Sequence, residues 1–123
     1  MTGKLSSRAQ VRLATLEEFR QKAHRVYALV EQYAAARAGV EPIVMALKRA
    51  LAQLKRDLLG AGFEQLSQLA GSMEVAAGRG TSQQARTRIL REGVGSIKSQ
   101  LEIEQRLTVS EDLAAQAKGN PRE

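Results

Sequence analysis

Hydrophobic residues recur along this chain at steps of three and four, which is the spacing of one face of an α-helix. The clearest run contains six apolar side chains: Leu16, Phe19, Ala23, Val26, Val30 and Tyr33. Polar and charged residues fill the positions between them, so the run predicts one amphipathic helix with coiled-coil-like spacing. We expect this helix to extend from about Leu5 to Ala38. Gly39 follows it, and glycine takes the left-handed conformation of a helix end at little cost.

A second periodic stretch begins near Pro42, a residue suited to the first turn of a helix. Its apolar positions lie on both sides of a glycine pair: Ile43, Leu47, Leu51, Leu54 and Leu58, then Phe63, Leu66, Leu69 and Met73. The step of five residues across Gly60-Ala61-Gly62 is a slip of phase. A continuous helix absorbs such a slip by a local change of supercoil. A turn is the alternative, because two glycines inside a helix cost about 1 kcal/mol each.

A third stretch follows the clearest break in the chain, Gly78-Arg79-Gly80. Thr81 and Gln84 have the spacing of a capping box, which predicts the start of a helix. The apolar positions of this stretch are Ala85, Ile89, Leu90, Val94, Ile97, Leu101 and Leu107, and Gly93 and Gly95 flank Val94 as candidate points of close helix packing. A second capping pattern, Thr108 with Glu111, leaves open whether the last segment is a separate short helix or a continuation.

The predicted fold is all-α: an antiparallel three-helix bundle of long helices, with a four-helix up-down bundle broken at Gly60–Gly62 as the alternative. With a continuous middle helix, the three helices span about 34, 36 and 38 residues and form a rod about 50 to 55 Å long. Matching lengths favour three helices, because each then finds partners along its whole face. We expect a single domain, 1–123, with frayed termini at 1–4 and 119–123.

Composition supports a helical protein with an aliphatic core. Apolar residues make up 43% of the chain and aromatic residues only 3%. The absence of cysteine excludes disulfides, thiolate metal sites and a cysteine nucleophile. We expect no secretory signal and no transmembrane segment, because no apolar run approaches about 18 residues. The predicted location is the cytoplasm.

The sequence offers little for catalysis. Its only histidine, His24, lacks the glutamate three residues before it that metal-carboxylate bundles use, and it is expected near the solvent. Acidic pairs such as Glu17-Glu18 and Glu111-Asp112 are adjacent and do not face each other on a helix. No phosphate-binding glycine loop follows a predicted strand. We therefore predict a protein that is not an enzyme and has no cofactor or metal site.

The distribution of basic residues suggests a candidate anion-binding site. The chain carries a net charge of +6 and has two basic groups: Lys4, Arg8 and Arg12 near its start, and Arg79, Arg86, Arg88 and Arg91 around the second break. In a three-helix bundle both groups lie at one pole, whereas in a four-helix bundle they lie at opposite ends. Aromatic residues are not interleaved, so nucleic-acid binding there would be driven by phosphates and blind to sequence. A solvated cationic end is the alternative. Helical periodicity keeps the basic residues off the apolar faces, so we expect these six to be exposed: Lys4, Arg8, Arg12, Arg86, Arg88 and Arg91.

These observations favour a non-enzymatic interaction module, of the kind found in adaptors, assembly factors or chaperone-like subunits. It would dock a protein partner or associate with itself as an oligomer. The end of the first helix, Tyr33–Ala38, is apolar over more of its circumference than a core requires. Sequence-nonspecific binding of nucleic acid or another polyanion through the basic pole is the alternative function.

Overall fold

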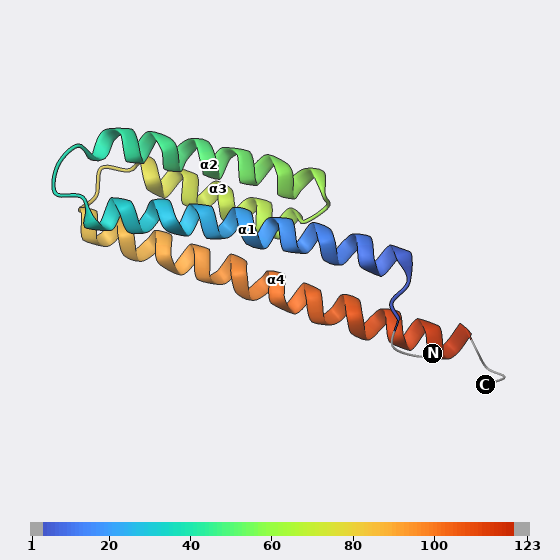
Figure 1. Ribbon diagram of the computed structural model, residues 1–123. Helices are drawn as coiled ribbons and strands as arrows, with labels where there is room; N and C mark the ends of the chain where they lie inside the picture. Colours follow the sequence, from blue (N-terminus) through green and yellow to red (C-terminus); the bar gives the residue numbers. More distant parts are fainter. Residues whose placement is uncertain (1–3, 120–123) are drawn as a thin grey trace.

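Four helices account for nearly all of the chain that the computed structural model describes, residues 4–119 (Figure 1). They are α1 (Ser7–Ala35), α2 (Val40–Gly60), α3 (Glu64–Gly78) and α4 (Gln83–Gly119). Within this range there is no strand, so the prediction of an all-α protein is confirmed. The expected frayed termini, 1–4 and 119–123, fall mostly outside the described residues.

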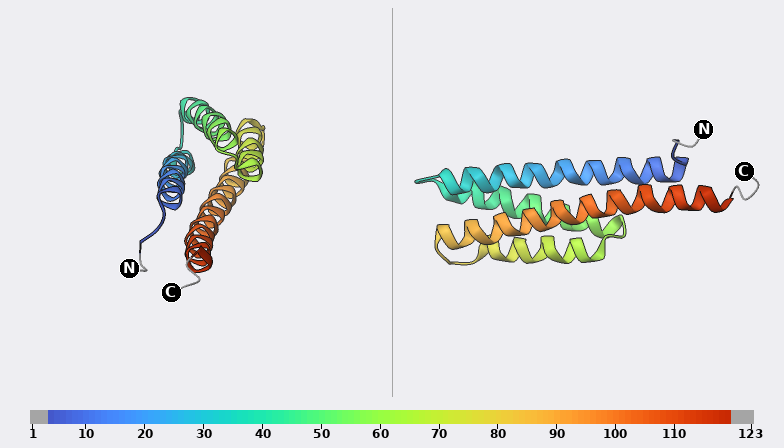
Figure 2. Two further views of the ribbon diagram at one scale, coloured as in Figure 1. Left: turned by 90° about the vertical axis from the view of Figure 1, so that its right-hand side faces the viewer. Right: turned by 90° about the horizontal axis from the view of Figure 1, so that it is seen from below.

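Each helix packs against two others and runs antiparallel to its neighbours in the chain (Figures 1 and 2). The contacting pairs are α1 with α2, α2 with α3, α3 with α4, and α1 with α4. The hairpin of α2 and α3 is short, so it covers only one part of the long α1–α4 pair. Beyond the turn of this hairpin, α1 and α4 continue side by side without cover. We call this second part the overhang, residues 6–12 and 103–119; at its inner limit Arg12 and Glu104 still lie beside the hairpin turn at Phe63.

The glycine pair forms a turn, where the preferred sequence interpretation had a continuous helix. Gly62 has φ of +88°, a left-handed conformation that a continuous helix excludes. The N–H of Phe63 donates to the carbonyl of Leu58 at 2.9 Å, and that of Gly62 donates to the carbonyl of Leu59 at 3.0 Å. This is the Schellman arrangement that closes many helix ends. The five-residue step therefore marks a reversal of the chain, with Leu58 and Phe63 both buried beside it.

The first break lies close to its predicted place. α1 ends at Ala35, three residues earlier than expected, and α2 begins at Val40. Gly39 is left-handed as predicted, with φ of +67°, but it is the N-cap residue of α2; the C-cap residue of α1 is Ala36, whose backbone is extended. Pro42 lies in the first turn of α2, where its missing N–H leaves no helical hydrogen bond unmade.

One aliphatic core joins all four helices in the covered part of the molecule. The six apolar residues of the first predicted run are all buried, which confirms that run. The largest fully buried side chains from the later stretches are Leu47, Leu51, Leu58, Met73, Leu90, Ile97 and Leu101. Ile89 and Leu107 were also assigned to a buried face, but each is 45% exposed. No helix within residues 4–119 is both long enough and apolar enough to span a membrane.

α4 is a single helix that approaches α3 closely. Its first turn is capped by Ser82, whose Oγ accepts from the N–H of Ala85 at 3.1 Å, rather than by the predicted Thr81. It continues through Thr108 without a break. A Cβ placed on Gly93 would lie 2.6 Å from Sδ of Met73, so the predicted close packing is confirmed at Gly93. At Gly95 the same position is open space.

Candidate functional site

The two groups of basic residues lie at opposite ends of the molecule. The side chain of Gln83, at the start of α4, donates to the carbonyl of Tyr33 near the end of α1. The side chain of Gln116, near the end of α4, donates to the carbonyl of Lys4. The single basic pole expected from three helices is therefore wrong. The additional turn at Gly62 reverses the chain once more and places the starts of α1 and α4 at opposite ends.

At the end formed by the chain termini, acidic residues of α4 offset the basic residues of α1. Lys4, Arg8 and Arg12 are exposed as predicted. Arg12 forms an ion pair with Glu104 at 3.2 Å, and its guanidinium lies 4.7 Å from the centre of the Phe63 ring. This end is therefore a surface of mixed charge.

A second polar contact ties the start of α1 to α4. Ser6 donates to the carboxylate of Asp112 through its hydroxyl at 2.6 Å and through its N–H at 3.0 Å. These hydrogen bonds stabilise the charged carboxylate and lower the pKa of Asp112. Between the two helices of the overhang, these polar contacts lie beside the buried Ala9.

The overhang also exposes large apolar side chains. Val11 is 67% exposed, Leu107 is 45% exposed and Ile103 is 44% exposed. Val11 lies about three helical turns before Lys22, which forms an ion pair with Asp57 of α2 at 2.8 Å. It therefore occupies the side of α1 that α2 covers further along the helix.

Leu107 occupies the corresponding side of α4. It lies about four helical turns after Gly93, the residue that packs against Met73 of α3. Leu107 is therefore in the row of α4 that faces α3, at a level that α3 does not reach. Apolar residues thus remain exposed on both helices where the covering hairpin ends.

At the opposite end, two of the four predicted arginines serve the fold. Arg86 was expected to be exposed, but it is only partly exposed and donates to the carbonyls of Arg79 and Thr81. Its guanidinium also lies 5.6 Å from the centre of the Tyr33 ring. It holds the loop before α4 against the end of α1, which leaves it less available to a ligand.

Arg91 joins α4 to α1 through a bidentate ion pair with Glu31, with N–O distances of 2.7 and 2.8 Å. The hydrogen bonds between the two groups lower the pKa of Glu31 and raise that of Arg91. Arg88 is exposed, as predicted, and Arg79 is exposed as well.

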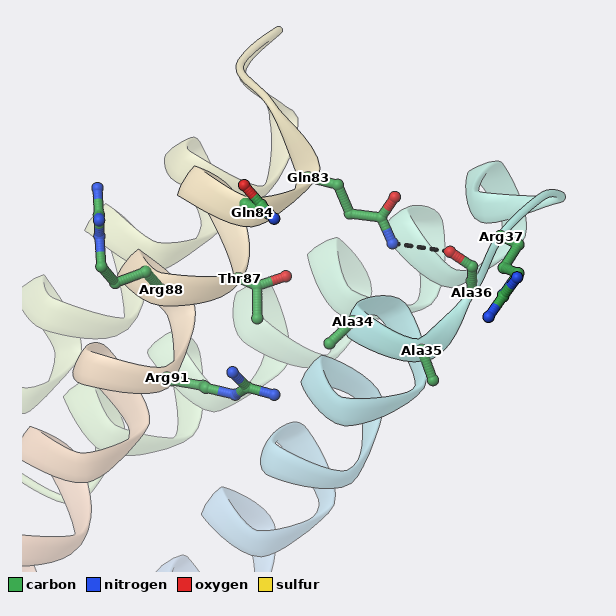
Figure 3. Close-up of a pocket in the computed structure, with 9 residues that line it drawn as sticks. All are labelled: Ala34, Ala35, Ala36, Arg37, Gln83, Gln84, Thr87, Arg88 and Arg91. Carbon is green, nitrogen blue, oxygen red and sulfur yellow. Dashed lines mark hydrogen bonds between the residues drawn. The ribbon is translucent and has the colours of Figure 1, made fainter.

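A groove of about 800 Å³ lies between the end of α1 and the start of α4 (Figure 3). We call it the arginine groove; its lining residues are Ala34, Ala35, Ala36, Arg37, Gln83, Gln84, Thr87, Arg88 and Arg91. On the α1 side the groove is lined by three alanines, whose side chains are small. Arg88 and Arg91 come from the predicted group, whereas Arg37 and Thr87 were not predicted. A signal for Thr87 is present in the sequence, because positions 84, 87, 88 and 91 share one helix face.

Thr87 is the least expected member of the groove. It is 5% exposed, and its hydroxyl has no hydrogen-bond partner among the residues that the structure describes. Figure 3 shows this hydroxyl directed from α4 toward the groove, on the side of Gln83 and Ala36. A buried hydroxyl without a partner is uncommon and calls for an explanation.

Neither metal geometry nor similarity to known proteins adds to this description. Within residues 4–119, no three histidine or acidic side chains gather as a metal site would require. His24 is exposed, as expected. No protein-family model matches the chain, and neither a curated protein nor a solved structure is significantly similar to it.

Proposed function

We propose that the protein is a non-enzymatic interaction module, a four-helix up-down bundle in solution that docks a partner protein on its overhang. The observation that carries this proposal is the exposure of Val11, Ile103 and Leu107 beyond the end of the covering hairpin. The first and last of these lie in the rows that α2 and α3 cover elsewhere. A partner with two amphipathic helices would extend those rows and bury these side chains.

Charge favours a different protein over a second copy as the occupant. Arg12 and Glu104 pair with each other, and Arg8 on α1 and Glu111 on α4 remain exposed and form no ion pair among the described residues. Two copies could stack their overhangs as a symmetric dimer. A twofold axis perpendicular to the helices would keep all neighbouring helices antiparallel, but α1 would then pack on α1 of the second copy and α4 on α4. Like charges would then meet on both edges, which disfavours that pairing. The complementary partner is acidic where it meets α1 and basic where it meets α4.

The first experiment is sedimentation of the purified chain, which should be monomeric. Affinity capture with the wild type then supplies a partner, which is purified and tested directly for binding. Leu107→Lys should weaken this binding by about tenfold or more, because a charge enters the apolar contact. Ile89→Lys is the matched control, since Ile89 is equally exposed but lies near the other end of α4.

Two results would contradict the proposal. One is a stable dimer of the chain that Leu107→Lys dissociates, because the overhang would then belong to a second copy. The other is a partner whose affinity falls equally in the Leu107→Lys and Ile89→Lys variants, because binding would then be independent of the overhang.

Sequence-nonspecific binding of nucleic acid is a second proposal, supported by the exposed Arg37, Arg79 and Arg88 around the loops. On duplex DNA, log K should fall by about 0.9 per phosphate contact for each unit of log salt. Reversing Arg79 and Arg88 to Glu should abolish binding, whereas reversing Arg8 and Arg12 should leave it intact. Binding that survives the first pair of changes would exclude this mode.

A further inference from the structure

We infer that the arginine groove binds the phosphate group of a small phosphomonoester. This site lies at the opposite end of the molecule from the overhang and does not depend on the docking function. The groove joins three features that a phosphate requires: guanidinium groups without internal partners, a helix N-terminus, and a buried hydroxyl that nothing in the described chain uses.

The buried hydroxyl of Thr87 is the observation that points to a ligand. Its side chain is enclosed by α4 and the end of α1, yet the hydroxyl makes no hydrogen bond within residues 4–119. Burial of an unsatisfied polar group is unfavourable, and valine would fill the same space without that penalty. A phosphate oxygen in the groove would accept a hydrogen bond from this hydroxyl and remove the penalty.

The charge of the groove suits a dianion. Arg37, Arg88 and Arg91 contribute three positive charges, and the Glu31 carboxylate bound to Arg91 removes one, which leaves two. Among the described residues neither Arg37 nor Arg88 forms an ion pair. In Figure 3 the Arg37 guanidinium lies beside the loop after α1, and the Arg88 side chain extends from α4 on the side away from α1. A phosphomonoester carries close to two negative charges at neutral pH, whereas each phosphodiester carries one.

The backbone around the groove also favours an anion. Gln83 and Gln84 begin α4, so the first, positively polarised turn of a long helix lines one end of the groove. The carbonyls at the end of α1 would repel an anion, but Nε2 of Gln83 donates to those of Tyr33 and Ala36 at 2.6 and 2.8 Å. This one side chain therefore masks two acceptors at the α1 end of the groove.

The test is a titration of the isotope-labelled full chain followed by amide NMR at constant ionic strength. The probes are inorganic phosphate, adenosine 5′-monophosphate, adenosine and a short single-stranded oligonucleotide. We expect saturable shifts at Gln84, Thr87 and residues 35–37 with the first two probes and none with adenosine. Saturation by inorganic phosphate as well as by the nucleotide assigns the phosphate group itself as the ligand.

The critical variant is Thr87→Val, which should have an equal or higher melting temperature and yet bind phosphate about tenfold more weakly. The pair Arg37→Gln with Arg88→Gln should weaken binding further, and the matched pair Arg8→Gln with Arg12→Gln should leave it unchanged.

Three results would overturn the inference: no saturable shift, equal shifts at both ends of the molecule, or unchanged affinity in Thr87→Val. Binding of the oligonucleotide alone would also overturn it.

Discussion

The covered part of the α1–α4 pair and the overhang are built from the same two helices but held by different forces. In the covered part, side chains such as Leu16, Val30 and Leu101 are buried with those of α2 and α3. In the overhang, Ala9 is the one buried side chain among the described residues, and the polar contacts between α1 and α4 are the ion pair of Arg12 with Glu104 and the hydrogen bonds from Ser6 to Asp112. Apolar residues continue past the end of the hairpin, but the large ones, such as Val11 and Leu107, are exposed there.

This difference follows from what two helices can bury. Two helices side by side leave most of each apolar stripe in water, and a third and fourth helix are needed to enclose it. Exposed ion pairs contribute about 0 to 1 kcal/mol each, whereas a buried leucine contributes about 1.5 to 3 kcal/mol. We therefore expect the overhang to open locally while the covered part stays folded.

Truncation of a leucine on each side of this boundary should show the largest contrast. Leu101→Ala removes a side chain that is 0% exposed and should lower the free energy of unfolding by about 2 to 5 kcal/mol. Leu107→Ala, less than two turns further along α4, should change it by less than about 0.5 kcal/mol. Denaturant unfolding of both variants measures the contrast. Similar losses in the two variants would mean that the overhang is packed.

A smaller contrast is expected between two glycines of the covered part. Gly93→Ala places a Cβ 2.6 Å from Sδ of Met73, so the packing of α3 on α4 must shift. Gly95→Ala meets open space and gains helix propensity. The first variant should be less stable than the second by about 1 to 3 kcal/mol in thermal unfolding. Equal stabilities would show that α3 does not press on α4 at this point.

The turn that ends the cover can be tested at its own two glycines. Gly62→Ala forces a side chain into a left-handed conformation and should cost about 1 to 2 kcal/mol. Gly60→Ala lies in helical backbone with open space around it and should stabilise the protein by about 0.4 to 1 kcal/mol. Thermal melts distinguish the variants. Stabilisation by both would indicate a continuous middle helix and therefore a bundle without an overhang.

The helical faces could be predicted from the sequence because burial follows a local period. All six members of the run from Leu16 to Tyr33 are buried, and the rows of α2 and α3 are largely correct. The turn at Gly62 could not be decided in this way. A five-residue step fits both a stutter and a Schellman end, and the two differ in a φ angle that hydrophobic periodicity does not encode.

The candidate site was harder to predict because it depends on the number of helices. One additional reversal moves Arg8 and Arg12 from the neighbourhood of Arg88 to the opposite end of the molecule. It also brings Arg37, in the loop after α1, and Thr87 on α4 to the same groove. Neither residue is notable within its own segment. Their importance comes from a contact between segments about 50 residues apart, which only the topology defines.

The smallest predicted effect is an acid-induced opening of the overhang. The pKa of Asp112 is lowered by hydrogen bonds from Ser6 to its carboxylate. A lowered pKa in the folded state means that this stabilisation is present above the unfolded pKa and is lost as the pH falls through the folded value. The start of α1 should therefore loosen below about pH 4, while the aliphatic packing of the covered part does not titrate.

Hydrogen exchange of the backbone amides measures this effect, with rates corrected for the intrinsic dependence on pH. Amides of residues 9–12 should lose protection as the pH falls, whereas those around Val26 and Leu51 should keep it. Asp112→Asn is the control, since its amide cannot titrate: protection at the start of α1 should be low at neutral pH and should change little with acid. If protection fell at Val26 as much as at the start of α1, the two parts would open together. The overhang would then not be less stable than the covered part.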